Sequence, residues 1–480
     1  MTGDLGGDAM TVGLPRPAAR SWWLEEAMAR PEFAGEPCPP LDRDTSADVV
    51  VIGGGYTGMW SAFFLKERQP DLDVVLLEQD VCGGGPSGRN GGFVNGFYDE
   101  AGLLSSRFGD EGRRTVDVAA RSIGEVGAWC ERHGVDAWYS PVSHLAISTS
   151  PAQDHGVEEM LDEMRRLGLD EIYRELDPSE IRARFDSPVA RRGFEVHHAA
   201  LVQPARLARG LRRVLLERGV RIFEGTHVTR FRGGEPVIAE TPRGAVRAGR
   251  AVVGVNAWAT AWREFRRRIM IRGTYIVVSA PAPDGLERMR WTGGEGVYDF
   301  RTALHYLRTT PDGRIAFGGA GLAVAPKKVT ARYDYDGGSV RDLVRDFRRW
   351  FPGLRDVPLV AAWGGPVDVS GWHLPFFGTM PGGTAHYGLG FTGNGVGPCH
   401  LGGKILSGLA LGIEDEATTL PIANVEPKHF PPEPLFTPGE RLVNRAILRK
   451  DALEDRGRRP DPVTNALARL PRRLGYNLGP

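Results

Sequence analysis

Residues Ala47 to Leu65 read ADVVVIGGGYTGMWSAFFL, a valine-rich run followed by three consecutive glycines and a long apolar segment. This pattern predicts a buried strand over 49–52, a tight turn, and a helix over 56–68. A second apolar run predicts another buried strand over 73–78. Strand, helix and strand in this order form a βαβ unit, which requires a parallel sheet.

The glycines of this segment match the pattern GxGxxG between the predicted strand and helix. Gly53 permits the tight turn, Gly55 lets the backbone approach a pyrophosphate, and Gly58 lets the helix pack closely on the strand. The helix begins at Tyr56 and Thr57, where free N–H groups and the positive end of the helix dipole favour phosphate. The same glycines also fit a turn that needs them only for steric reasons.

Glu78 strengthens the dinucleotide interpretation. It lies about 20 residues beyond Gly58, at the end of the second predicted strand, which is the usual place for a ribose-binding acid. Its carboxylate can accept both ribose hydroxyls and would repel a 2′-phosphate, so Glu78 favours NAD or FAD over NADP. The loop does not distinguish NAD from FAD.

Composition sets the remaining limits. The 480 residues are 41% hydrophobic and 25% charged, as expected for a soluble protein with more than one core. Sixty Lys plus Arg balance sixty Asp plus Glu, so no net charge recruits nucleic acid or a membrane surface. The four cysteines form no metal or disulfide pattern, and no signal peptide or membrane span is evident. We expect a cytoplasmic protein without a metal site, and the oligomeric state stays open.

A second glycine-rich segment, CGGGPSGRNGG, runs from Cys82 to Gly92. Its part from Ser87 to Gly92 resembles the second flavin-contact segment of the D-amino-acid-oxidase-like family of FAD-dependent oxidoreductases, particularly the γ-glutamylputrescine-oxidase-like branch. Small residues let the chain pass close to a planar ring and a second stretch of phosphate. A flexible surface loop is the alternative interpretation.

Three further segments resemble this family: HHAALVQPARLARGL from His197, AVVGVNAW from Ala251, and YGLGFTGNGVGPCHLGGKIL from Tyr387. Together with the first loop they imply non-covalent FAD, and an NAD dehydrogenase would leave them unexplained. The implied FAD contacts are Gly53, Gly55, Tyr56, Thr57, Gly58, Glu78, Gln79, Ser87, Gly88, Arg89, Asn90, Gly91, Gly92, Val228, Asn256, Gly393, Asn394, Gly395, Val396 and Gly397.

The resemblance implies an α/β fold, in which a Rossmann-like FAD-binding domain of the glutathione-reductase type is interleaved with an α+β substrate domain. The FAD-binding domain would take residues 45–105, 196–260 and 355–415, and the substrate domain 106–195 and 261–354. An N-terminal arm over 1–44 and a C-terminal extension over 416–480 complete the chain.

The chemistry that the resemblance implies is oxidation of a C–N bond in a small amine. Hydride leaves the carbon beside an unprotonated amine for flavin, the imine hydrolyses, and O2 or another acceptor takes the electrons. Because flavin performs the difficult step, the protein mainly orients the substrate in a dry cavity. An amino-acid oxidase with a relocated carboxylate anchor, and a flavin-binding protein without turnover, remain alternatives.

Val367 departs from the family pattern. Amino-acid-acting relatives carry an arginine shortly before a Pro-x-x-Gly segment to clamp the substrate carboxylate, and counting back from Pro375 places Val367 there. We therefore expect an amine without that carboxylate, or one recognised by another arginine, for which Arg272, Arg301 and Arg308 are the candidates.

The substrate cavity is expected beside two strands over 303–309 and 314–318, joined by a turn. Alternation places His305 on one face of the sheet and Tyr306 on the other, so one of them meets the flavin. His305, Tyr306 and Trp363 are the catalytic or substrate-pocket candidates. Each also fits a structural role, as a hydrogen-bonded histidine or as core aromatics.

Overall fold

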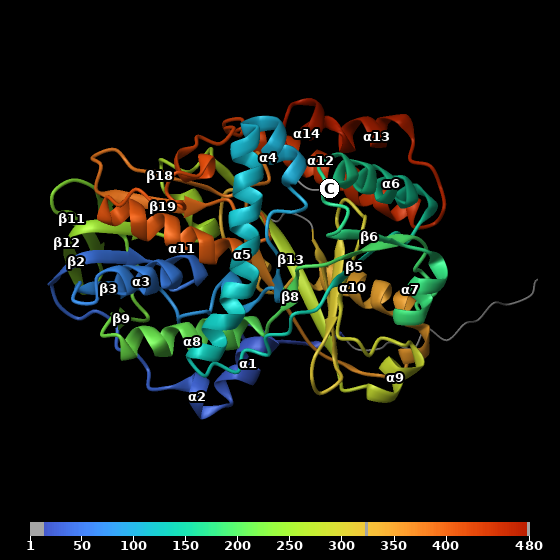
Figure 1. The fold of residues 1–480 in the computed structure, drawn as a ribbon, viewed down its shortest axis with the longest axis horizontal. Helices are drawn as coiled ribbons and strands as arrows, with labels where there is room; N and C mark the ends of the chain where they lie inside the picture. The colour runs from blue at the N-terminus through green and yellow to red at the C-terminus, as the bar shows by residue number, and fades with distance from the viewer. Residues whose placement is uncertain (1–13, 322–324, 478–480) are drawn as a thin grey trace, which may run out of the picture.

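The structure is a computed structural model that describes residues 14–321 and 325–477. The first thirteen residues of the predicted arm and the last three of the extension lie outside this description. Two sheets form the frame of the molecule, and helices cover them (Figure 1).

The eight-stranded sheet is built around the predicted βαβ unit. β2 (Thr45–Ile52) pairs in parallel with β3 (Val74–Leu77) and with β12 (Gly244–Val253), and β9 (Arg221–Phe223) and β19 (Ala385–Leu389) extend the parallel part. Its central residues, Val49 to Ile52, are all buried, because both faces of a parallel sheet are covered. The sheet is completed by β10 (Arg230–Arg232), β11 (Val237–Thr241) and β18 (Phe376–Thr379).

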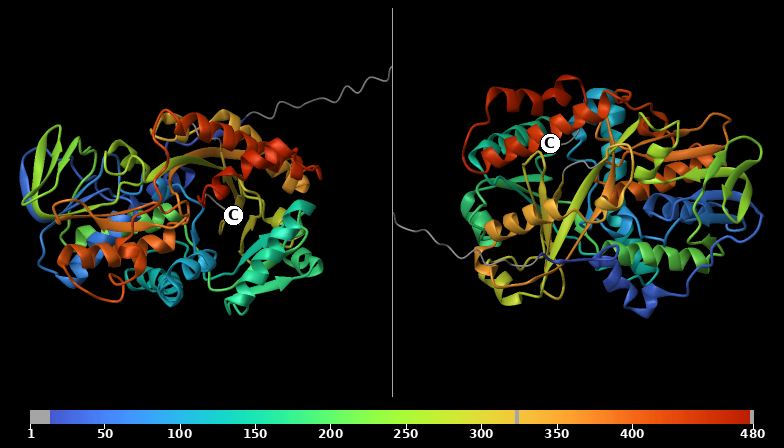
Figure 2. Two further views of the ribbon diagram at one scale, coloured as in Figure 1. Left: turned by 90° about the horizontal axis from the view of Figure 1, so that it is seen from above. Right: turned by 180° about the vertical axis from the view of Figure 1, so that it is seen from behind.

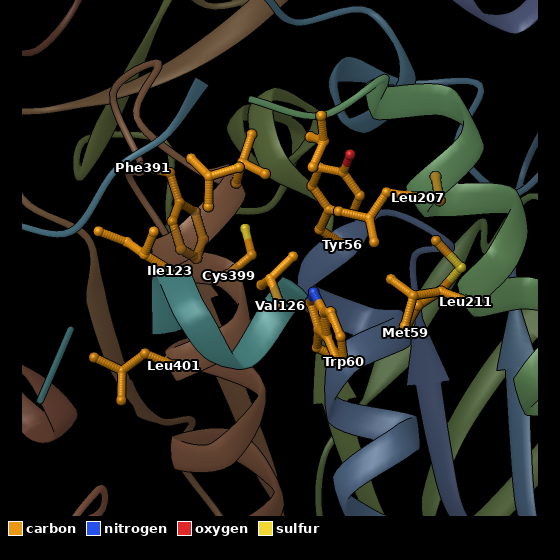
Figure 3. Packing of buried hydrophobic residues seen from close by; sticks show 14 of the residues in the cluster. Tyr56, Met59, Trp60, Ile123, Val126, Leu207, Leu211, Phe391, Cys399 and Leu401 are labelled. Carbon is orange, nitrogen blue, oxygen red and sulfur yellow. The ribbon is translucent and has the colours of Figure 1, made fainter. Parts of the chain in front are cut away.

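One face of this sheet is covered by α3 (Tyr56–Arg68), α8 (Pro204–Glu217) and α11 (Val396–Leu411). The long α5 (Asp110–Arg132) crosses α11. Figure 3 shows the cluster in which Met59 and Trp60 of α3 meet side chains of α5, α8 and α11. This core fixes the first turn of α3, and with it the glycine loop, against the end of β2.

The nine-stranded sheet is mixed and lies beside the first (Figure 2). Its order is β1 (Arg16–Pro17), β17 (Leu359–Ser370), β13 (Ile269–Ser279), β16 (Ile315–Ala320), β15 (His305–Thr309), β14 (Gly296–Asp299), β5 (His144–Ile147), β7 (Gly193–Val196) and β6 (Tyr173–Leu176). One face packs on α10 (Gly337–Trp350), through apolar residues that include Phe317 and Phe347. The other face turns toward the eight-stranded sheet.

The remaining helices lie around these sheets. α4 (Ala101–Phe108) precedes α5, and α6 (Pro151–Arg166) packs on β6 and β7. The C-terminal helices α12 (Phe436–Glu454), α13 (Pro462–Ala468) and α14 (Leu470–Arg473) cover one end of the nine-stranded sheet (Figure 1). The others are α1 (Trp22–Met28), α2 (Pro31–Ala34), α7 (Pro178–Arg184) and α9 (Pro283–Arg288), and a short sheet pairs β4 (Phe93–Val94) with β8 (Ala200–Leu201).

The predicted helix over 56–68 is α3 at the same bounds. Residues 359–370 lie within the segment 355–415 that we expect in the FAD-binding domain, but they pair with β13 in the nine-stranded sheet. Strand pairing assigns this segment to a sheet that the periodicity of a single run cannot identify.

Candidate active site

A cavity of about 1150 Å³ is lined by residues of both sheets. It begins at the glycine loop after β2, passes the ends of the parallel strands, and continues along the face of β13 and β15. Ligands of open α/β sheets bind outside the carboxyl ends of the strands. The cavity therefore lies where the sequence predicts the dinucleotide.

The first loop has the close packing that its glycines predict. A side chain at Gly58 would overlap the carbonyl oxygen of Gly53, and one at Gly53 would overlap that of Gly254. Gly53, Gly55, Tyr56 and Thr57 line the cavity, whereas Gly58 does not and serves the contact between helix and strand. The N-terminus of α3 is thereby held at the cavity, where it favours phosphate.

Glu78 is held in place by backbone donors. Its Oε2 accepts the N–H of Gly54 at 2.7 Å and its Oε1 accepts the N–H of Asp80 at 2.8 Å. Burial raises the pKa of Glu78 to about 7. Glu78 and Gln79 both line the cavity, as a ribose-binding acid and its neighbour should.

The second loop is fastened to the first. The hydroxyl of Ser87 accepts the N–H of Tyr56 at 2.8 Å, and the Nδ2 of Asn90 donates to the carbonyl oxygens of Pro86 and Ser87. Arg89 forms an ion pair with Asp334 and donates to the carbonyl oxygen of Gly84 at 2.7 Å. These bonds hold Ser87, Arg89, Asn90 and Gly91 along the cavity wall, but Gly88 and Gly92 pack behind it.

The third predicted block also reaches the cavity. Gly393, Asn394, Gly395 and Val396 line it, at the N-terminus of α11. Gly397 does not line the cavity but packs against the backbone of Asn95, where any side chain would overlap the carbonyl oxygen. A helix N-terminus at this place stabilises negative charge on a bound group.

Asn256 is joined to a residue that the sequence did not indicate. Its Nδ2 donates to Oδ1 of Asp368 at 2.7 Å, and Oδ2 of Asp368 accepts the N–H of Gly390 at 2.6 Å. Burial raises the pKa of Asp368 to about 7. This carboxyl group therefore ties three separate chain segments together at the cavity.

The far end of the cavity is lined by residues 226–231, with Trp258 and Trp262. Val228 is among them, as predicted, and stands in the loop before β10. The aromatic side chains and the backbone of this loop suit a planar base.

Of the three catalytic candidates, Tyr306 lines the cavity. Its hydroxyl lies 2.7 Å from Oγ1 of Thr274, and burial raises its pKa to about 12. It is thus a neutral phenol that can donate or accept a hydrogen bond at the substrate end.

The prediction for His305 is wrong. Its side chain is on the opposite face of the sheet, where Nδ1 lies 2.8 Å from Asp299 and Nε2 lies 3.2 Å from Asp346. Burial would lower the pKa of His305, but the two carboxylates raise it above its ordinary value. Strand alternation sends residues 305 and 306 to opposite faces, so only one of them could reach the cavity.

The prediction for Trp363 is also wrong. Its ring is fully buried, packs edge-on against Trp23, and donates from Nε1 to the carbonyl oxygen of Arg89 at 2.9 Å. It does not line the cavity and instead supports the second loop from behind.

Arg272, one of the three arginines named from the sequence, also lines the cavity. Three further residues of the substrate end were not indicated by any motif: Glu100, Tyr298 and His373. Asp99, beside Glu100, accepts the hydroxyl of Tyr173 at 2.6 Å. Burial and the charge of Asp99 raise the pKa of Glu100 to about 8, and its Oε2 has no hydrogen-bond partner. A buried, unpaired carboxyl oxygen in a cavity is a site for a hydrogen-bond donor from a ligand.

Comparison with known proteins identifies the family of the chain. The family model described as "FAD dependent oxidoreductase" (DAO) matches residues 48–409. The chain belongs to this family of FAD-dependent oxidoreductases. A probable oxidoreductase OrdL of Rhizobium meliloti (strain 1021) is 30% identical over 428 residues, which cover 86% of this chain and 92% of the relative. The gamma-glutamylputrescine oxidoreductase of Escherichia coli (strain K12) is 28% identical and covers 78% of this chain and 86% of its own length.

Solved structures of the family share the fold. Glycine oxidase from Geobacillus kaustophilus superposes with a TM-score of 0.63 at 19% identity, covering 77% of this chain and 96% of that one. L-proline dehydrogenase from P. horikoshii also gives 0.63, at 20% identity, with 80% and 96% covered. The predicted α/β FAD-binding fold is thereby confirmed.

Membership of the family makes the chain an FAD-dependent oxidoreductase. The described residues fit FAD: two small-residue loops, the ribose acid Glu78 and two helix N-termini line one continuous cavity. Within those residues no group of His, Cys, Asp and Glu could hold a metal ion. Nor does any helix in the described ranges have the length and apolar character to cross a membrane.

Proposed function

We propose that this chain oxidises the C–N bond of a small primary, secondary or N-methylated amine. Bound FAD would accept the hydride from the carbon beside the unprotonated nitrogen, and water would hydrolyse the resulting imine to a carbonyl compound and a smaller amine. FAD, when bound, supplies the two-electron acceptor, and O2 then removes the electrons. The names of the relatives support an amine, because they include a gamma-glutamylputrescine oxidoreductase and a sarcosine oxidase subunit beta.

The observation that carries this proposal is the unpaired Oε2 of Glu100 at the substrate end of the cavity. A substrate ammonium would donate its hydrogen bond there. The bound cation would lower the pKa of Glu100 from its raised value of about 8, because an opposite charge favours the carboxylate, and the carboxylate would then take up the proton that the amine must lose. Tyr298 and Phe300 line the cavity with it, and aromatic faces attract a cationic amine.

The other residues of this end would orient the substrate. Tyr306 presents its hydroxyl beside Thr274, and the ring stands against Gly91 of the second loop. The tyrosine is thus placed between the predicted flavin contacts and the substrate end. Apolar neighbours such as Leu304 and Phe194 exclude water from the reacting carbon.

Anaerobic reduction of the purified, FAD-loaded protein tests this function. We expect the flavin absorbance to bleach on addition of a suitable amine from a panel of primary, secondary and N-methylated compounds. Admission of O2 should then restore the absorbance and produce hydrogen peroxide. A flavin that stays oxidised with every amine would indicate a binding protein without turnover.

We also propose that FAD is held non-covalently and that the protein resides in the reducing cytoplasm. Cys399 lines the cavity, but burial raises the pKa of its thiol to about 12, which disfavours the thiolate that would attack flavin. All four cysteines are free thiols. Acid precipitation should release all of the flavin into the supernatant, whereas yellow colour in the pellet would contradict this part of the proposal.

A further inference from the structure

We propose that Arg272 is a specificity residue that binds a carboxylate of the substrate, so that the preferred substrate is an amine that also carries a carboxylate. This inference rests on the proposed function and names the substrate class. Two expectations were drawn from the absence of an arginine at Val367, and this inference adopts the second, in which another arginine recognises the carboxylate.

Strand register carries the first step. β13 and β17 are antiparallel neighbours, and Arg272 stands directly opposite Val367. Directly opposite residues project from the same face of a sheet, with Cβ atoms about 5 Å apart. Arg272 therefore stands on the strand next to the position, Val367, where amino-acid-acting relatives carry their arginine. Arg272 and Val367 both line the cavity.

The second step is that Arg272 lacks a partner. Its Nε is buried without a hydrogen-bond partner, and across residues 14–321 and 325–477 its guanidinium donates no hydrogen bond and forms no ion pair. Burial lowers the pKa of Arg272, but an arginine still remains protonated. A buried guanidinium without a hydrogen-bonded partner is costly unless a ligand pairs with it, and a carboxylate is the group that matches its fork of donors.

Of the neighbours of Arg272, His373 agrees with an anionic ligand and Glu440 competes with one. Burial and the charge of Arg272 lower the pKa of His373 to about 4, so this imidazole is neutral, and its buried Nδ1 has no partner. The charge of Glu440 on α12 also acts on Arg272. Glu440 does not line the cavity, however, and makes no ion pair with Arg272 among the described residues.

The other two candidate arginines are already occupied. Arg301 forms ion pairs with Asp346, Asp451 and Asp455. Arg308 donates to the carbonyl oxygen of Val202. Neither lines the cavity, which leaves Arg272 as the free one of the three.

The test compares matched substrates that differ only in the carboxylate. Anaerobic flavin reduction is measured with N-methylglycine against its amide, and with 4-aminobutanoate against 4-aminobutanamide. We expect the wild-type enzyme to prefer at least one acid over its amide. Arg272→Gln should reduce this preference roughly a hundredfold, mainly through KM, and Arg272→Lys should restore part of it. Arg107→Gln is the matched control, because Arg107 stacks on Trp372 next to His373 without lining the cavity.

A second measurement does not depend on turnover or on the variant's stability. Propionate should perturb the absorbance of the oxidised wild-type flavoprotein in a saturable way, and propionamide should not. Equal reduction rates for acids and amides, an unchanged preference in Arg272→Gln, or the same loss in Arg107→Gln would overturn the assignment. If no amine reduces the flavin, the proposed function fails, while the propionate titration still decides whether Arg272 binds a carboxylate.

Discussion

The hydroxyls of Tyr306 and Thr274 lie 2.7 Å apart although their strands, β15 and β13, are separated by β16. The tyrosine ring crosses the intervening strand over Gly318, where any side chain would overlap the ring. A glycine in the middle strand thus brings the phenol to the cavity and holds it at one angle.

Tyr306→Phe keeps the ring and removes this hydrogen bond. We expect kcat/KM for the amine to fall about fivefold, because one oriented hydrogen bond is worth about 1 kcal/mol, while the FAD content stays the same. Stopped-flow flavin reduction measures the effect. A rate equal to that of wild type would mean that the hydroxyl does not contact the substrate.

His305→Gln should separate a structural histidine from a catalytic one. We expect the free energy of unfolding of the variant to be about 2 kcal/mol lower than that of wild type, which lowers its Tm. Its rate of flavin reduction should be unchanged. Asp299 and Asp346 raise the pKa of His305 in the folded state. Protonated His305 therefore stabilises the folded protein fully at a pH below the pKa of histidine in the unfolded chain, and this stabilisation is lost as the pH rises through the pKa of His305 in the folded state. The difference in Tm between the variant and wild type should therefore become smaller as the pH rises. A slower flavin reduction in the variant would instead indicate that His305 takes part in the reaction.

Glu78→Gln should weaken FAD binding. The amide can still accept from Gly54 but offers no charge to the ribose hydroxyls, and hydrogen bonds to charged groups are worth about 1.5–3 kcal/mol. We expect Kd for FAD to rise about 10- to 100-fold in fluorescence titrations of the apoprotein. Asp73→Asn is the control, since Asp73 pairs with Arg221 at the opposite end of β3 and should leave Kd unchanged.

Gly397→Ala and Gly439→Ala form a matched pair in two helices. A methyl group at Gly397 would overlap the carbonyl oxygen of Asn95, whereas none of the described atoms lies within 4 Å of one at Gly439. We expect the first variant to lose FAD and Tm because the N-terminus of α11 must move. The second should be as stable as wild type or slightly more so, since alanine favours helix over glycine. Equal behaviour of the two would contradict the close packing at Gly397.

The pH dependence of stability should report on Glu100. Its folded-state pKa is raised from 4.5 to about 8, so the folded apoprotein holds a proton that the unfolded chain releases, and the free energy of unfolding falls as pH rises between these values. Glu100→Gln removes this contribution, so its Tm relative to wild type should increase from pH 5 to pH 9. Parallel profiles would show that Glu100 ionises normally.

Short-range sequence pattern was sufficient to predict the first part of the FAD site. The strand, the glycine loop, the helix and Glu78 are close in sequence, and the need for backbone to approach a phosphate restricts the residue types at each position. The second loop and the block at 393–397 were predicted from the resemblance to the family, and most of their residues line the cavity.

The substrate half was decided by tertiary structure. Alternation along β15 showed that His305 and Tyr306 point to opposite faces, but only the packing of α10 on one of those faces assigned Tyr306 to the cavity. Likewise, the sequence marked Val367 as a missing arginine and named Arg272 among three replacements, yet strand register alone placed the two residues side by side. Local sequence specifies how a segment binds a phosphate, whereas the lining of a pocket depends on long-range strand pairing, which no single segment encodes.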